Sequence, residues 1–270
     1  MNRNSITSFA EYSDLISGYK TDRSLSNNYM MREEVERHIA ASDMSFSATD
    51  NNLFLLVRKP KCMRMYYYLN DFDELYVPDE NVVIEILFRG NQCFPTVEND
   101  YFRHCGFQEN LIRDLYAGTF SDMNISMSGR RDLNIGFANN IGQIELAGEM
   151  FNSVFDPYSG DYISANEYET LLRGKHMMVA YDSDGNFTGA LHQTRKGTAV
   201  WISHIAVAER FRGRQIGQAL LDTWIAVNHN DGYDRYMLWV QRQNAAAVSM
   251  YRKTGFRYLN KSTISLLYLK

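Results

Sequence analysis

The sequence predicts an α/β protein, of the α+β kind, with two tandem domains that are each a mixed, mostly antiparallel sheet flanked by helices. Three observations carry this prediction. Apolar strand-like runs alternate with helical patterns along the 270 residues. One such run passes through a basic, glycine-bearing turn directly into a helix. The order of elements in the first half also returns in the second, as a duplication would produce.

The first half begins with two helical patterns, at about residues 8–19 and 28–41. Two apolar strands follow, at 53–58 and 64–69, and the short stretch between them contains Pro60. A proline-bearing turn between two apolar runs is typical of a hairpin. We therefore expect two helices followed by a hairpin.

A small, polar stretch from Ala117 to Gly129 is expected to be a linker. After it the same order returns, with two helices and then two strands, at about 141–154, 164–173, 176–181 and 187–193. We expect a first domain at residues 1–120, a linker with the first strand of the second domain at 121–140, and the second domain at 141–270.

The repeat is sharpest near the ends of the two halves. Residues 101–107 (Tyr-Phe-Arg-His-Cys-Gly-Phe) are similar to 250–256 (Met-Tyr-Arg-Lys-Thr-Gly-Phe), which pairs Phe102 with Tyr251 at an offset of 149 residues (251 − 102). The alternative is chance similarity over seven positions. The segment 69–78 is acidic, lacks glycine and is too short for a basic turn and helix. The first domain is therefore expected to be non-catalytic, shaping substrate access or an interface.

In the second half, the strand-like run 201–207 leads through a basic turn into a helix with an apolar face. Free N–H groups at a helix start, the helix dipole and a nearby glycine favour a bound anion, here a pyrophosphate. Three arginines add charge-assisted hydrogen bonds: Arg210, Arg212 and Arg214. The alternative is an ordinary basic helix cap with solvated arginines.

A further strand-like run at 236–240 precedes a second helical pattern that begins after Asn244. Ala247 and Tyr251 share one face of this helix because they are four residues apart. Gly255 stands where a left-handed residue usually ends a helix. The segment reads Asn-x-x-Ala-x-x-x-Tyr-x-x-x-Gly-Phe.

The helix-opening pattern from Arg212 to Gly217, followed by this segment, resembles motifs A and B of the GNAT superfamily of acyl-CoA-dependent N-acyltransferases. The resemblance covers roughly residues 140–270. The second segment is similar to that of ribosomal-protein alanine N-acetyltransferases and of the C-terminal half of mycothiol synthase. One departure is Gln215, which stands where the first motif glycine is usual and brings a Cβ toward the expected phosphate.

The resemblance implies acetyl-CoA, or another acyl-CoA, as co-substrate, with no metal. The backbone of one strand segment would pair with the pantetheine amides: Ile205, Ala206 and Val207. The turn and first helical residues would hold the pyrophosphate: Arg212, Gly213, Arg214, Gln215, Ile216 and Gly217. Asn244 would hydrogen-bond the cofactor arm.

Two side chains are catalytic candidates. By the resemblance, Tyr251 would donate a proton to the departing thiolate; the alternative is an ordinary core tyrosine. His204 is the titratable group within the strand 201–207, and a β-bulge could re-aim it to act as the general base. The alternatives are a buried structural histidine and deprotonation through water.

The implied reaction is transfer of an acetyl or other acyl group from acyl-CoA to a primary amine, by direct attack in a ternary complex. The three cysteines all lie in the first half, so no covalent nucleophile is expected in the second: Cys62, Cys93 and Cys105. A small molecule or a protein N-terminus would fit as acceptor. The alternatives are a non-catalytic acyl-CoA-binding or scaffold protein, and an aminoacyl or long-chain acyl transferase.

Composition agrees with a cytoplasmic enzyme. A hydrophobic fraction of 45% supports a packed core, and the net charge of −4 argues against a general nucleic-acid binder. Three cysteines without zinc-site spacing favour free thiols. No signal-like N-terminus and no apolar run of about 18 residues is present, so neither export nor a membrane span is expected.

Overall fold

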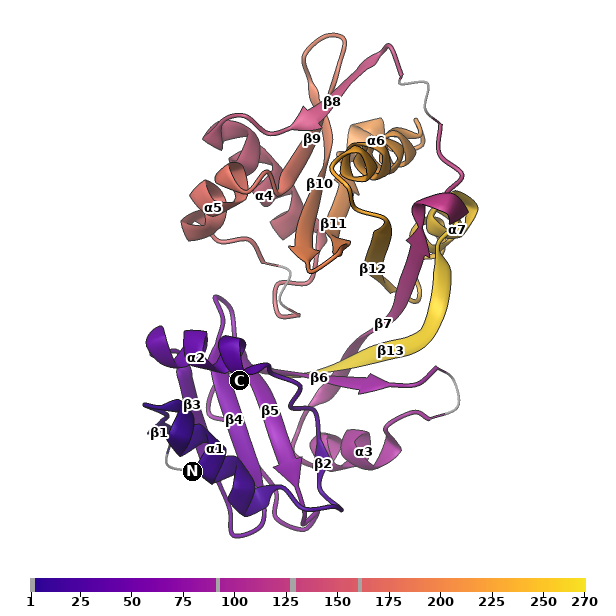
Figure 1. The fold of residues 1–270 in the computed structure, drawn as a ribbon. Coiled ribbons are helices and arrows are strands. Elements are labelled where there is room, and N and C mark those ends of the chain that lie inside the picture. The colour runs from indigo at the N-terminus through magenta and orange to yellow at the C-terminus, as the bar shows by residue number, and fades with distance from the viewer. Residues whose placement is uncertain (1–2, 91–92, 127–129, 160–161) are drawn as a thin grey trace. The chain divides into compact units, whose positions relative to one another are not determined.

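The computed structural model describes residues 3–90, 93–126, 130–159 and 162–270. These residues form two compact units. Unit 1 comprises Met1–Ile112 together with Ser262–Lys270, and unit 2 comprises Arg113–Lys261. Two long strands cross the boundary between the units along the chain: β7 (Gln108–Thr119) and β13 (Arg257–Tyr268) (Figure 1).

In its described residues, unit 1 contains three helices and the strands of a sheet that β13 completes. Its elements are β1 (Asn4–Ser5), α1 (Phe9–Tyr19), β2 (Leu25–Ser26), α2 (Arg32–Ala40), β3 (Met44–Ala48), β4 (Leu53–Arg58), β5 (Met63–Leu69), β6 (Val82–Phe88) and α3 (Thr96–His104). The strand order is β1-β3-β4-β5-β6-β13, with β2 beside β5. Within this order β5 and β6 are parallel, whereas the other registered pairs are antiparallel.

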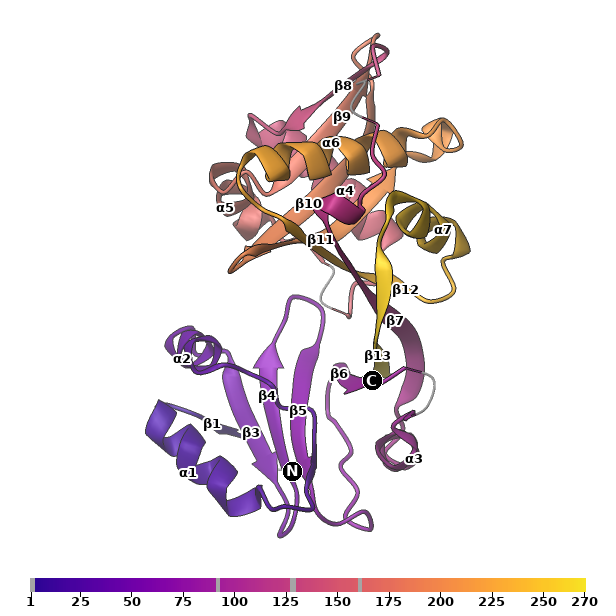
Figure 2. The same ribbon diagram turned by 45° about the vertical axis from the view of Figure 1, so that its right-hand side comes forward.

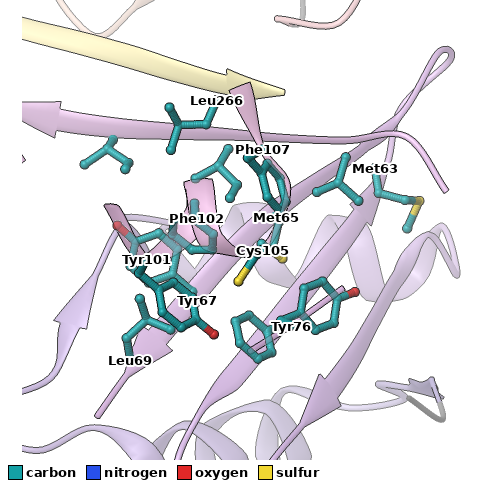
Figure 3. Packing of buried hydrophobic residues seen from close by; sticks show 14 of the residues in the cluster. Met63, Met65, Tyr67, Leu69, Tyr76, Tyr101, Phe102, Cys105, Phe107 and Leu266 are labelled. Atoms are coloured by element: carbon teal, nitrogen blue, oxygen red, sulfur yellow. The ribbon is translucent and has the colours of Figure 1, made fainter. Parts of the chain in front are cut away.

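Alternation along β4 explains how this sheet becomes covered on both faces. Phe54 and Leu56 pack into a core with α3, whereas Leu53 and Leu55 pack into a second core with α1 and α2. A strand buried on both faces reads as a continuous apolar run, as β4 does. Figure 3 shows the α3-side core, in which Tyr67, Tyr101 and Phe102 lie together.

Unit 2 repeats this architecture and adds a long helix. Its elements are the 3-10 helix η1 (Phe120–Asp122), β8 (Leu133–Phe137), α4 (Ile141–Val154), η2 (Ala165–Glu167), α5 (Tyr168–Arg173), β9 (Met177–Asp182), β10 (Phe187–Lys196), β11 (Ala199–Val207), η3 (Glu209–Phe211), α6 (Ile216–Asn230), β12 (Arg235–Gln241) and α7 (Ala245–Thr254). The strand order is β8-β9-β10-β11-β12-β7, and β11 and β12 form its parallel pair. In Figure 2, α6 crosses in front of the strands of unit 2.

Both sheets therefore have the same strand order, with one parallel pair at the same place. The duplication is visible in the topology: β5 and β6 of unit 1 match β11 and β12 of unit 2, and α3 matches α7. The last strand of each sheet, however, comes from the other half of the sequence. β13 completes the sheet of unit 1 by pairing with β6, and β7 completes that of unit 2 by pairing with β12.

This exchange makes the two units differ from the contiguous segments 1–120 and 141–270. Residues 262–270 lie in unit 1, and residues 113–120 lie in unit 2. The expected linker is also shorter than predicted. Residues 117–119 continue β7 and pair with β12, residues 120–122 form η1, and 127–129 lie outside the described residues. Small residues within a paired strand resemble a linker in the sequence because turns use the same residue types.

The other predicted elements agree with the structure, with shifted ends. α2 begins at Arg32 rather than near residue 28, because residues 25–26 form β2 and residues 27–31 are neither helix nor strand. The helix expected at 164–173 consists of η2 and α5. Within the described residues, none of the three cysteines forms a disulfide.

Candidate functional site

The two parallel strands of unit 2 separate at their carboxyl ends. Their pairing runs from Ala199↔Arg235 to Ile202↔Leu238. Beyond this last pair β11 continues to Val207 and β12 to Gln241, and the register no longer joins them. The strand segment predicted to bind pantetheine, residues 205–207, therefore lies on the separated part of β11.

A β-bulge marks the start of the separation. The pairing of β10 with β11 shifts between His192 and Gln193, which lie opposite His204 and Ile202. Ser203 is therefore the extra residue on β11 at this point. A bulge increases local twist and bends the strand. A bulge that could re-aim His204 is thus present, and its position explains why β11 separates from β12 here.

The turn after β11 presents unpaired backbone donors. Gly213 and Gln215 both have positive φ angles, 77° and 59°. The first backbone hydrogen bond into α6 joins the N–H of Ala219 to the carbonyl of Gln215, at 3.0 Å. Within the described part of the chain, the N–H groups of residues 213–217 donate to no backbone acceptor. The first turn of α6 also contains no acidic residue, so nothing there opposes an anion.

Gln215 adopts the left-handed conformation at the start of α6, with φ 59° and ψ 20°. Glycine adopts this conformation without steric cost, whereas other residues pay about 1 kcal/mol or more. Glutamine in place of the motif glycine therefore costs conformational free energy at this residue, but the turn keeps the backbone conformation that glycine favours.

The three arginines of the turn are exposed and directed differently. The guanidinium groups of Arg210 and Arg214 lie over the ring of Phe211, at 4.7 and 5.4 Å from its centroid. Arg212 donates from Nε to the carbonyl of Val207 at 3.4 Å. Arg130 donates to the carbonyl of Arg214 and forms an ion pair with Asp132. Four cationic groups therefore gather around these backbone donors.

A hollow of about 490 Å³ lies beside this turn, between α4 and the end of β11. Apolar side chains form much of its lining, and Arg212, Glu149 and Glu209 add charge. The space is large enough to receive part of a ligand that is held by the turn.

Tyr251 lies on α7 and is 4% exposed. Its ring packs edge-on against Phe256, at 5.7 Å between centroids. Burial raises the pKa of this phenol well above its usual value, so it keeps its proton at neutral pH. No hydrogen bond joins its hydroxyl to another described residue. The group is therefore a protonated donor whose hydroxyl has no intramolecular acceptor among those residues.

Asn244 is the N-cap of α7. Its Oδ1 accepts a hydrogen bond from the N–H of Ala247 at 3.1 Å, which is the usual way to cap a helix. The side chain is exposed, and capping uses only its oxygen. Its Nδ2 group, with two donors, forms no hydrogen bond to another described residue.

His204 is buried and pairs with another histidine. Its Nδ1 lies 3.0 Å from Nδ1 of His192, on the neighbouring strand β10. The rings of Phe151 and Phe155, on and just after α4, pack against it. Burial, and then the proximity of His204, lower the pKa of His192 to about 3. His192 therefore stays neutral, and one proton is shared between the two Nδ1 atoms.

The structure brings several predicted residues together on one side of the sheet. One apolar cluster contains Ile205, Val207, Ile216 and Tyr251, which come from β11, α6 and α7. His204 lies toward α4, on the opposite face. His192 was not among the predicted site residues. The signal for it was the β10–β11 hairpin, since strands that fold back on each other place residues 192 and 204 opposite one another.

The neutral state of His192 leads to a pH prediction. Because its folded pKa lies below the usual value of 6.5, the unfolded chain binds a proton more readily. Its contribution to stability is therefore present above pH 6.5 and is lost as pH falls from 6.5 toward 3, by at most about 1.4 kcal/mol per pH unit. Proton NMR should show a His192 ring that does not titrate between pH 8 and 5. A midpoint near 6.5 would contradict the burial argument.

Among the described residues, no group of three or more His, Cys, Asp or Glu side chains is arranged to bind a metal ion. In the same part of the chain, no helix combines the length and the apolar character that a membrane crossing requires.

The fold and site together define a GNAT-type acyltransferase architecture. Residues 144–256 match the sequence model of the Acetyltransferase (GNAT) family. This part of the chain, which holds the separated strands, the turn and α7, is therefore a GNAT acetyltransferase domain. No curated protein sequence matches the chain.

Solved structures extend the likeness to the tandem arrangement. A GCN5-related N-acetyltransferase from Sphaerobacter thermophilus has a TM-score of 0.59 at 14% identity, covering 84% of this chain and 80% of that one. A tandem GNAT protein from the clavulanic acid biosynthesis pathway has a TM-score of 0.54 at 9% identity, covering 93% and 84%. A GNAT-family acetyltransferase from Colwellia psychrerythraea has a TM-score of 0.52 at 14% identity and full coverage of both chains.

At these identities the structural neighbours establish the fold alone, which is that of tandem GNAT domains. The fold prediction is confirmed. The finer resemblance to ribosomal-protein alanine N-acetyltransferases and to mycothiol synthase stays a prediction, as do the roles of the individual site residues.

Proposed function

We propose that this protein is an N-acyltransferase that moves an acetyl or other acyl group from acyl-CoA to a primary amine in unit 2. The observation that carries the proposal is the coincidence, within the GNAT domain, of the separated strands β11 and β12 with the free N–H groups at the start of α6. None of the findings supports the non-catalytic alternative.

The residues present fit an acyl-CoA. The N–H groups of residues 213–217 and the nearby arginines offer donors and positive charge to a pyrophosphate. The separated edge of β11 offers peptide groups to the amides of the pantetheine arm, as an added strand would use them. The Nδ2 group of Asn244 is our candidate donor to the same arm.

The reaction requires one proton to leave the amine and one to reach the thiolate. The acceptor nitrogen attacks the thioester carbonyl carbon as the carbon–sulfur bond breaks, so the amine loses a proton and the thiolate gains one. Tyr251, held protonated by burial, is our candidate donor to the thiolate. Because His204 lies on the face of the sheet opposite Tyr251, it is our candidate base for the amine through a bridging water, with His192 as the hydrogen-bond partner that orients its ring.

The acceptor is a primary amine of a small molecule or of a protein N-terminus. The decisive experiment is titration calorimetry of coenzyme A with the intact chain, followed by an acetylation screen over amines of both kinds. Detectable coenzyme A binding with turnover on one acceptor class supports the proposal. Absence of coenzyme A binding at millimolar concentration would overturn it.

The pyrophosphate assignment predicts the effect of charge reversal in the turn. Arg212→Glu or Arg214→Glu should weaken coenzyme A binding by about 1.5–3 kcal/mol per lost charge-assisted contact. That is about 10- to 150-fold in Kd. Pantetheine, which lacks the pyrophosphate, should bind both variants as it binds the parent. Calorimetry with both ligands measures the difference.

Arg173→Glu is the matched control, because Arg173 lies on α5 with 82% of its side chain exposed. It makes the same change of net charge away from the turn, so coenzyme A affinity should change little. If both turn variants bind coenzyme A like this control, the turn does not hold the pyrophosphate.

A further inference from the structure

In unit 1, the chain itself occupies the gap between the two parallel strands. The parallel pairing of β5 with β6 ends at Met65↔Ile84, and β5 then runs on to Leu69. Along that free segment β2 pairs with β5 instead, with Leu25 opposite Leu69 and Ser26 opposite Tyr68. The edge of β5 that no longer pairs with β6 is therefore covered by the segment between α1 and α2.

Asn27 bridges both sides of the gap. Its Nδ2 donates to the carbonyl of Met65 on β5 at 3.1 Å and to the carbonyl of Glu85 on β6 at 3.0 Å. Its Oδ1 accepts from the N–H of Tyr67 at 2.9 Å. The side chain is 3% exposed, so these three bonds are sheltered from water. An amide group placed in this way acts as an inserted peptide unit between two strands.

Ser26 adds a fourth bond, from its Oγ to the carbonyl of Tyr67 at 2.7 Å. Two successive residues thus satisfy both backbone groups of Tyr67 and one carbonyl on each side. Buried backbone groups are costly without partners. The sequence therefore replaces an absent ligand or strand with its own polar side chains.

We propose that Ser26–Asn27 fills the gap between β5 and β6, which corresponds to the proposed acyl-CoA site between β11 and β12 of unit 2. The two residues take the place of an amide-bearing ligand. The comparison with a pantetheine arm rests on the function proposed for unit 2. Unit 1 then keeps its sheet intact without a cofactor and binds none.

Two independent features of unit 1 agree with this. Phe102, which matches Tyr251 in the repeat, is fully buried, and its ring centroid lies 4.9 Å from that of Tyr67. Figure 3 shows the two rings beside each other. The segment after β5 carries three carboxylates, Asp71, Asp73 and Glu74, where unit 2 has its basic turn. A pyrophosphate would meet negative charge there.

The first test is amide hydrogen exchange on the intact chain, with and without coenzyme A. The Tyr67 amide should be protected in the parent before any coenzyme A is added. Addition of coenzyme A should slow exchange within residues 203–218 and leave residues 65–69 unchanged. Slower exchange at 65–69 on addition of coenzyme A, or two molecules bound per chain, would overturn the proposal.

The second test replaces the bridging group. Asn27→Ala should speed exchange of the Tyr67 amide at least 10-fold. The control is Asn28→Ala, whose Nδ2 bonds the hydroxyls of Tyr12 and Tyr68 rather than the gap. It should change Tyr67 exchange less than threefold. Equal effects of the two variants would overturn the proposal.

Asn27→Asp covers the case in which the alanine variant fails to fold. The carboxylate can still accept from Tyr67 but meets the carbonyls of Met65 and Glu85 as a second acceptor. At pH 7 the Tyr67 amide should therefore exchange much faster in the variant than in the parent. Near pH 4 the protonated acid can donate again, so the ratio of the two exchange rates should be smaller. Parent-like exchange at pH 7 would overturn the proposal. If coenzyme A binds nowhere, the function proposed for unit 2 fails, while the Asn27 variants still decide whether the gap is filled.

Discussion

Tyr251→Phe should lower turnover by about 10²- to 10⁴-fold, the usual worth of a positioned acid or base. The substitution removes only the hydroxyl, and no hydrogen bond joins that hydroxyl to another described residue. The ring still packs against Phe256, so the fold should survive. Affinity for coenzyme A should change little, because backbone groups and arginines of the turn are proposed to carry it. Steady-state kinetics and calorimetry on one preparation separate the two effects.

Tyr236→Phe is the matched control within unit 2. Tyr236 is also fully buried, but its hydroxyl donates to the carbonyls of Ile225 or Tyr233. Its loss should lower thermal stability and leave turnover per folded molecule unchanged. Turnover in Tyr251→Phe within threefold of the parent would show that water or another group protonates the thiolate.

The sequence predicted the second domain in detail because each element there has a local signal. The strand, basic turn and helix from residue 201 onward have hydrophobic periodicity, glycine and charge in a fixed order. Gly255, for example, adopts φ 113° at the end of α7, as its position predicted. Local patterns of this kind do not depend on what the strand pairs with.

Strand exchange could not be predicted in the same way. Ile264 and Leu266 alternate on β13 and would fill the core of either sheet, yet they pack in unit 1. Periodicity fixes which side chains face inward but not which sheet receives the strand. The contiguous boundaries expected at residues 120 and 141 followed from that missing information.

Asn27 and His192 were missed for a related reason. Each is a single polar residue whose role depends on a partner distant in the chain: the carbonyl of Glu85 for Asn27, and His204 for His192. A buried polar group shows its role only when its hydrogen bonds are known. The two units thus differ at the gap between their parallel strands. Side chains fill it in unit 1, whereas the strand edge stays open in unit 2.

His204→Gln should reduce turnover by about 10²- to 10⁴-fold if His204 is the general base. Glutamine keeps a polar side chain beside His192 but does not accept a proton near neutral pH. Coenzyme A affinity should stay within about twofold, because His204 lies toward α4, away from the cluster that contains Tyr251. The rate should also lose its dependence on a group that must be neutral, so the acidic limb of the pH–rate profile should disappear.

His192→Asn distinguishes the pair from an isolated histidine. The Nδ1 of His192 orients His204 by a 3.0 Å contact, and asparagine removes that partner while both flanking aromatic rings remain. Turnover should fall by less than in His204→Gln, because His204, the proposed base, is still present. If His204→Gln keeps both its rate and its acidic limb, the amine loses its proton to water without the histidine. The buried pair would then be a structural contact between β10 and β11.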